Sequence, residues 1–150
     1  MTEFSDFVSQ AEAVLRRGLV ARFGADTGRT AAVDVLSWAW SRWERIGGMQ
    51  NPTGYLYRVA VNQTKRRLVR RPARFPVVPY EAEPWVEPGL PAALAQLSPR
   101  QREVVVLVHG YGMSHSETAE LLGLKRSTIQ NHLERGLKKL RTELGVHDHA

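Results

Sequence analysis

The sequence predicts an all-α protein made of two small helical domains joined by a proline-rich linker. Apolar residues recur at helical spacing on both sides of the linker, and glycines mark the breaks between the expected helices. Six of the eight prolines lie between Pro72 and Pro91. Because proline fixes φ, lacks an N–H donor and disfavours helix in the residue before it, this stretch is expected to be extended. We therefore divide the chain into a domain 1–71, a linker 72–90 and a domain 91–150.

Three helices are expected in the first domain. Apolar residues from Phe4 to Leu15 indicate the first, and residues 24–28, bounded by glycines, are expected to form a turn. The second covers Thr30 to Ile46. A loop is expected at 47–54, and the third helix covers Tyr55 to Arg71. The apolar side of the second helix is predicted to contain the following residues, with the two tryptophans in the core: Val33, Leu36, Trp40 and Trp43.

The end of the third helix is strongly basic. Five of its last seven residues are cations: Lys65, Arg66, Arg67, Arg70 and Arg71. Cations at a helix C-terminus suit the helix dipole, but one or two would be enough for that effect. The cluster therefore indicates an anionic partner, in line with a formal net charge of +6 for the whole chain.

The second domain begins with a short helix at 92–97. Ser98 is predicted to be the N-cap of the next helix, with Pro99 at its first position, and this helix is expected to run to about His109. The segment 114–117 reads Ser-His-Ser-Glu, which is a capping box and should begin another short helix. A turn around Gly123 then leads into a last helix at about 126–144. Its buried stripe is predicted to be Ile129, Leu133, Leu137, Leu140 and Leu144.

A short capped helix, a turn with glycine and a longer amphipathic helix together form a helix-turn-helix. The start of the last helix would present arginine, serine, glutamine and asparagine side chains to solvent. Arginine pairs with guanine and glutamine or asparagine with adenine, and the first turns of a recognition helix enter the major groove. An ordinary helical hairpin with a polar face is the alternative that spacing alone leaves open.

Composition excludes several classes of protein. The chain has no cysteine, so it has no disulfide scaffold, thiol nucleophile or cysteine-based zinc site. The first seven residues contain two acids and no apolar run, unlike a signal peptide. The apolar run 104–108 is too short to cross a membrane. We therefore expect a cytoplasmic protein without membrane contact.

The segments 97–107, 112–124 and 127–141 strongly resemble region 4 of the sigma-70 family, in its extracytoplasmic-function (ECF) group. The sequence Thr-Ile-Gln-Asn-His-Leu at 128–133 also fits the output domain of LuxR-type regulators. The sequence of the first domain distinguishes between the two families. Residues 51–72 resemble sigma regions 2.3 and 2.4, and residues 35–46 resemble region 2.2. A LuxR-type protein has no such N-terminal half, so an alternative sigma factor is the favoured interpretation and a stand-alone LuxR-type regulator is the alternative.

The resemblance implies two partners, core RNA polymerase and promoter DNA. Members of the family are often held inactive by an anti-sigma factor, so such a protein is a candidate third partner. It implies that the last helix contacts the −35 element through Lys125, Arg126, Ser127, Thr128, Gln130, Asn131 and Arg135. It implies that the third helix and the loop before it open the −10 element through Gln50, Asn51, Tyr55, Arg58, Asn62, Lys65, Arg66 and Arg70. The candidate contacts to core polymerase are Asp34, Trp38 and Arg42.

The chain departs from the family pattern at two places. Region 2.2 usually opens with several acids, whereas residues 29–34 keep only Asp34. The polymerase contacts are therefore less well defined by sequence than the DNA contacts. Thr118 stands where the family prefers an apolar residue, and we expect its hydroxyl to bond to a carbonyl one turn back.

An enzyme acting on nucleic acid is the third interpretation. Such a site would need clustered carboxylates for metal ions, or a nucleophile beside a base. The acids of this chain are scattered instead over helix starts and solvated faces. We therefore expect no catalytic residue, no metal site and no cofactor.

Overall fold

The structure is a computed structural model of the 150-residue chain, and it describes residues 3–70 and 89–145. These residues form helices and connecting turns without a β-strand, which confirms the predicted all-α fold. In chain order the elements are α1 (Phe4–Phe23), α2 (Ala25–Trp40), α3 (Trp43–Ile46), α4 (Pro52–Arg70), α5 (Leu90–Gln96), α6 (Pro99–Val105), the π-helical turn η1 (Val106–Gly110), α7 (His115–Leu122) and α8 (Arg126–Glu143).

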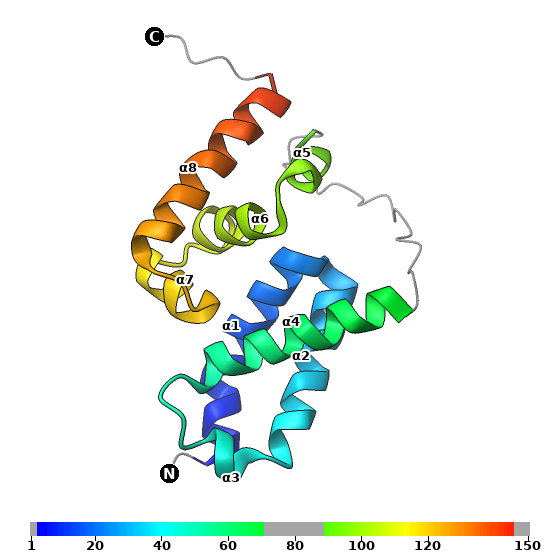
Figure 1. Ribbon diagram of the computed structural model, residues 1–150, viewed down its shortest axis with the longest axis vertical. Helices are drawn as coiled ribbons and strands as arrows, with labels where there is room; N and C mark the ends of the chain where they lie inside the picture. The colour runs from blue at the N-terminus through cyan, green and yellow to red at the C-terminus, as the bar shows by residue number, and fades with distance from the viewer. Residues whose placement is uncertain (1–2, 71–88, 146–150) are drawn as a thin grey trace.

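The first half is a small bundle in which α1 and α2 pack along each other and α4 lies across both (Figure 1). The buried stripe of α1 includes Leu15 and Leu19, while Val35 of α2 and Leu56 of α4 complete the layer; all four side chains are fully buried. Helical spacing of apolar residues therefore correctly predicted the buried side of α1.

The second half packs α8 against α6, with α7 beside both. Ile129 and Leu133 of α8 are buried, as the sequence predicts. At Gly136, a Cβ atom would lie 2.7 Å from a methyl group of Val105, so the glycine lets α6 and α8 approach closely. The capping boxes begin two of these helices: Ser98 accepts from the amide of Gln101, and Ser114 accepts from that of Glu117.

The break between the first two helices is shorter than predicted. Residues 24–28 were expected to be a turn, but only Gly24 breaks the helix, with φ of 88°, and α2 begins at Ala25. Gly28 lies inside α2, where a Cβ atom would come within 2.5 Å of the backbone of Val20. The prediction was wrong because this glycine serves close packing of α1 on α2, which overrides its weak helix propensity.

The predicted helix Thr30–Ile46 is interrupted. α2 ends at Trp40, and α3 forms a separate short turn from Trp43. Two residues that were expected to face the core are exposed: Val33 is 64% and Trp40 is 67% accessible. Trp43 lies against the core with its ring 4.7 Å from that of Phe7. Because α2 stops before Trp43, the interruption changes which side of the segment is buried, and this cannot be read from spacing alone.

Three further boundaries differ from the prediction. α4 begins at Pro52 rather than Tyr55, because Asn51 caps it by accepting a hydrogen bond from the amide of Gly54 at 3.0 Å. The first helix of the second half begins at Leu90 rather than Ala92. The helix expected to reach His109 leaves α-helical geometry after Val105 and ends in η1, where the amide of Tyr111 bonds to the carbonyl of Val106.

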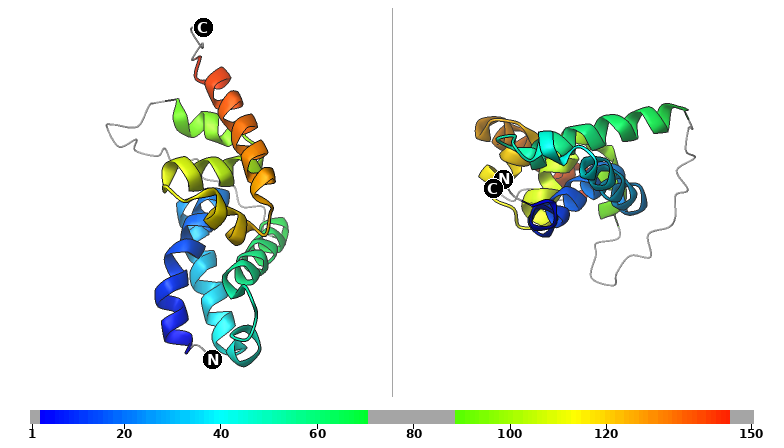
Figure 2. Two further views of the ribbon diagram at one scale, coloured as in Figure 1. Left: turned by 90° about the vertical axis from the view of Figure 1, so that its left-hand side faces the viewer. Right: turned by 90° about the horizontal axis from the view of Figure 1, so that it is seen from below.

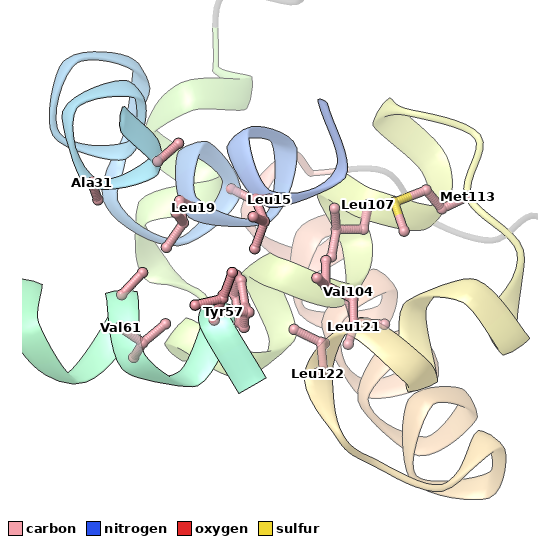
Figure 3. Close-up of a cluster of buried hydrophobic side chains, with 14 of the residues drawn as sticks. Leu15, Leu19, Ala31, Tyr57, Val61, Val104, Leu107, Met113, Leu121 and Leu122 are labelled. Atoms are coloured by element: carbon pink, nitrogen blue, oxygen red, sulfur yellow. The ribbon is translucent and has the colours of Figure 1, made fainter. Parts of the chain in front are cut away.

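The two halves pack directly against each other. α6 contacts α1, α7 contacts α4, and the second half is stacked lengthwise on the first (Figure 2, left). One buried cluster contains side chains of both halves, with Leu15 and Tyr57 from the first beside Val104 and Leu122 from the second (Figure 3). The predicted division into domains stays a prediction, since the linker 72–90 lies outside the described residues apart from Gly89 and Leu90.

Candidate nucleic-acid interface

α7 and α8 form the predicted helix-turn-helix. Gly123 ends α7 in the left-handed conformation, with φ of 69°. Leu124 and Lys125 complete the turn, and α8 begins at Arg126. The apolar side of α8 is buried and its polar side is free. Among the residues predicted to contact the −35 element, Thr128 is half-buried and the others are exposed: Lys125, Arg126, Ser127, Gln130, Asn131 and Arg135. The structure therefore gathers this predicted set on one accessible face.

The electrostatic environment of α8 is positive. His132 lies half-buried on the helix, and its pKa is lowered by burial first and then by the charges of Arg100 and Arg135. The side-chain amide of Gln130 donates to Glu134 at 2.8 Å, which leaves its oxygen free to accept. A face of this kind can bind phosphate oxygens with its cations and base edges with its amides.

A second exposed polar row runs along α4. It is formed by Arg58, Asn62, Lys65, Arg66 and Arg70, all from the set predicted for the −10 element. The remaining basic residue of this helix end, Arg67, is paired with Asp34 of α2 at 2.9 Å, so it is less available to DNA. Tyr55 is half-buried, and its hydroxyl accepts a hydrogen bond from Arg45 at 3.3 Å.

Sequence reasoning missed two cations that lie next to this row, Arg22 of α1 and Arg100 of α6. Both line a cavity of about 190 Å³ together with Arg58 and Lys65 of the row. These arginines are far from α4 in the sequence, and only the packing of the two halves brings them there. No sequence signal at Arg22 or Arg100 could have indicated it.

Asn51 does not lie where the prediction placed it. Instead of presenting its amide to solvent, it donates from Nδ2 to the backbone carbonyl of Glu120 in α7, at 2.9 Å, while Oδ1 caps α4. Gln50 beside it is exposed. The two loop residues that were predicted together therefore have different environments in this arrangement.

The predicted polymerase contacts lie on α2 and at its end. Trp38 and Arg42 are brought together, with the guanidinium 4.4 Å from the ring centroid, whereas Asp34 is engaged by Arg67. The exposed apolar pair Val33 and Trp40, seven residues apart and therefore on one side of α2, was missed. Its signal was present in the sequence, but it was assigned to the core.

Other kinds of site find little support in the part of the chain that the structure describes. No group of three or more metal-ligating side chains occurs among residues 3–70 and 89–145. Within the same ranges, no helix is both long and apolar enough to span a bilayer.

Comparison with known proteins decides between the families that the sequence suggested. Residues 89–140 match the family model "Sigma-70, region 4", which covers α5 through most of α8. The RNA polymerase sigma-E factor of Streptomyces avermitilis is 32% identical over 97% of this chain and 87% of its own length. The chain belongs to the sigma-70 family of sigma factors. A further sigma-E factor, from Streptomyces antibioticus, is 36% identical over 76% of this chain and 68% of its own length.

Solved structures of sigma factors share the fold of this sigma factor. The sigma factor RpoE of Bartonella quintana, in complex with the anti-sigma factor NepR, has a TM-score of 0.66 at 19% identity, covering 95% of this chain and 97% of that one. CnrH, in complex with the cytosolic domain of CnrY, has a TM-score of 0.60 at 23% identity, covering 97% and 89%. The predicted membership of the ECF group is confirmed, and the LuxR-type alternative has no support.

Proposed function

We propose that this sigma factor directs core polymerase to its promoters by reading the −35 element with α8 and opening the −10 element with α4 and the loop before it. The observation that carries the proposal is that one chain presents two separate polar, cation-rich helical faces, the start of α8 and the outer row of α4. A regulator with a single reading helix needs only the first of these faces.

The −35 assignment rests on the direction in which α8 faces. Ile129 and Leu133 fix the helix against its own core, so Arg126 and Gln130 must point away from it. An arginine and a glutamine one turn apart can each make a bidentate contact to a base edge in the major groove. Lys125 at the N-cap would hold a phosphate, which orients the helix without specifying sequence.

The −10 assignment rests on α4. Separating strands costs a few kcal/mol per flipped base, which a protein recovers by holding the displaced strand. Arg58 and Lys65 can bind its phosphates, and Asn62 between them can bind a base edge. These three side chains are exposed on one side of α4, whose opposite side is anchored in the core by Leu56 and Ala60.

The polymerase contact is proposed on α2 and includes two residues that the sequence did not indicate. Val33 and Trp40 are both exposed on one side of α2, the helix that also carries Asp34 and Trp38, and the ring of Trp40 lies edge-on to that of Phe4. Exposed large apolar residues that lie together mark interaction sites. This chain lacks most of the acids that usually open region 2.2. Apolar contacts would therefore supply the energy for polymerase binding that charge pairs supply in family members with those acids.

Replacing Trp40 by alanine is therefore expected to weaken binding to core polymerase. Buried aromatic anchors at interfaces contribute about 2 kcal/mol or more, which is roughly a 30-fold change in Kd. Binding of labelled sigma factor to core polymerase measures this directly. Tyr111→Ala removes another exposed aromatic, from the second half, and should leave the affinity unchanged. Equal affinities for Trp40→Ala and the unaltered chain would contradict the assignment.

Run-off transcription tests the function as a whole. Purified core polymerase is incubated with a pool of promoter fragments, with and without this protein. Specific transcripts that appear only in its presence support the proposal, and their start sites identify both promoter elements. Binding to DNA without binding to core polymerase would contradict it.

Two features of the proposal follow from the family rather than from a site. The sigma factor would act without a cofactor, because nucleotidyl transfer belongs to the polymerase, and in the cytoplasm, where the polymerase is. An anti-sigma factor is proposed as a third partner, since the two solved structures named above are complexes, of RpoE with the anti-sigma factor NepR and of CnrH with the cytosolic domain of CnrY. Co-purification from the native organism tests this.

A further inference from the structure

The cavity of about 190 Å³ described above has a strongly cationic lining. Arg22 comes from α1, Arg58 and Lys65 come from α4, and Arg100 comes from α6. Asn62 of α4 adds a side-chain amide, and Tyr57, which is buried in the cluster of Figure 3, forms part of the wall. Cations from three helices therefore converge on one small space.

A single carboxylate partly neutralises this lining. Glu103 of α6 is fully buried, with Oε1 2.7 Å from Nη1 of Arg22 and Oε2 3.6 Å from Arg100. Tyr57 donates its hydroxyl to Oε2 of the same carboxylate. Burial, and then the charge of Glu103, raises the pKa of Tyr57 well above its ordinary value, so the hydroxyl keeps its proton and adds no negative charge. No acid lines the cavity in the part of the chain that the structure describes, so the one charge of Glu103 stands against four cations.

Most of the cationic groups in the lining are free to bind a ligand. Arg58 and Lys65 are exposed, and within residues 3–70 and 89–145 they form no ion pair, unlike Arg67, which pairs with Asp34. Arg22 uses one nitrogen for the buried carboxylate. In the same ranges no buried side-chain nitrogen lacks a hydrogen-bond partner. The other N–H groups of Arg22 therefore reach solvent in the cavities that its side chain lines.

The lining selects a compact anion that carries several charges. Guanidinium groups bind phosphate oxygens in pairs, and a lysine binds them as a point charge. A singly charged anion such as chloride would leave most of the excess positive charge uncompensated. Pockets that enclose a whole small molecule usually measure roughly 300–1,000 Å³, and this cavity is smaller. Phosphate groups fit it, whereas the sugar and base of a nucleotide would stay outside.

We propose that Arg22, Arg58, Lys65 and Arg100 form a binding site for the phosphate groups of a small anion, either free pyrophosphate or the terminal phosphates of a nucleotide. The bound anion contacts cations of both halves of the chain. This inference goes beyond the proposed function and does not depend on it, because the ligand is not DNA. Two of the four cations, Arg22 and Arg100, also lie outside the set predicted for the −10 element.

Isothermal titration calorimetry of the full chain with inorganic pyrophosphate tests the site. Saturable binding at one site is expected. Arg58→Ala and Arg100→Ala, one from each half, should each weaken it about tenfold, as expected for the loss of one charge-assisted hydrogen bond. Arg66→Ala is the matched control. Arg66 is an exposed arginine on the same helix and does not line the cavity, so its replacement removes the same charge and should leave the affinity nearly unchanged.

Titration with ADP distinguishes the two sources of phosphate. Equal affinities for ADP and pyrophosphate would show that the phosphate groups alone are bound. Tighter binding of ADP would show that the nucleoside adds contacts outside the cavity. Both results support the proposal, provided that Arg58→Ala and Arg100→Ala weaken the two ligands alike.

Three results would overturn the proposal. The first is that the folded chain does not bind pyrophosphate; if Arg58→Ala still weakens binding of single-stranded DNA, the −10 function of α4 stands and only this site fails. The second is equal weakening by Arg58→Ala and Arg66→Ala, which would indicate attraction by net charge alone. The third is unchanged binding in Arg100→Ala, which would place the anion on α4 only. If Arg100→Ala loses helical circular dichroism, Arg100→Gln takes its place, and Arg58→Ala changes only an exposed side chain.

Discussion

Glu103→Ala is expected to destabilise the folded chain by about 3–5 kcal/mol, the cost of removing one partner of a buried ion pair. The carboxylate is fully buried and the side chain of Arg22 is only 11% exposed, so the remaining guanidinium cannot recover its hydration while the halves stay together. Chemical denaturation followed by tryptophan fluorescence and by circular dichroism measures the loss.

The double variant Arg22→Met, Glu103→Leu is the matched control for this prediction. It removes both charges and fills the space with apolar atoms, and a substitution of this kind is often neutral or stabilising. The hydroxyl of Tyr57 keeps an acceptor, because it also bonds to the carbonyl of Gly18 at 3.3 Å. We therefore expect the double variant to recover most of the stability that Glu103→Ala loses. A double variant as unstable as the single one would show that the attraction within the ion pair, rather than the unpaired charge left on Arg22, accounts for the loss.

Arg126→Ala and Gln130→Ala are expected to relax promoter choice, each at one base pair of the −35 element. Loss of a bidentate contact costs roughly 1–3 kcal/mol for the preferred sequence and little for others. Binding of the polymerase–sigma complex to a set of single-base −35 variants measures this as a flattened preference. The physical basis is the exposure of both side chains on a helix whose other side is fixed by Ile129 and Leu133.

Lys125→Ala distinguishes base contacts from phosphate contacts on the same helix. It should weaken binding to all sequences alike and reduce the dependence of affinity on salt, because one fewer counterion is released. If Arg126→Ala and Gln130→Ala behaved like Lys125→Ala, α8 would bind the duplex without reading it. Unchanged affinity and preference in all three variants would place −35 recognition elsewhere.

The helices that could be predicted from sequence are those whose signals are local. The N-cap at Ser98 and the capping box at Ser114 lie where the sequence placed them, and Thr118 bonds to the carbonyl of Ser114 at 2.9 Å, as expected. Such contacts join residues three or four apart, so the residue types alone specify them. The exposed face of α8 followed in the same way from the spacing of its apolar residues.

The misassigned residues lie where periodicity is ambiguous. Val33 and Trp40 were assigned to the core because large apolar side chains at helical spacing usually pack there. α2 instead buries Ala31, Ala32, Val35 and Ala39, whose small side chains let α1 and α4 come close. Which of two apolar sides is buried depends on the neighbouring helices, and the sequence of α2 does not contain that information.

The sequence by itself determined the all-α class, most of the helices, the exposed polar face of α8, the basic row of α4 and the family, because each of these depends on residues that are near one another in the chain. Only the tertiary structure decided how the halves meet. The pairing of Glu103 with Arg22 joins residues 81 positions apart, and the bond from Asn51 to Glu120 spans 69. Such contacts follow from packing that buries α6 and α7 against α1 and α4, and no local pattern encodes which distant side chain will complete a buried charge.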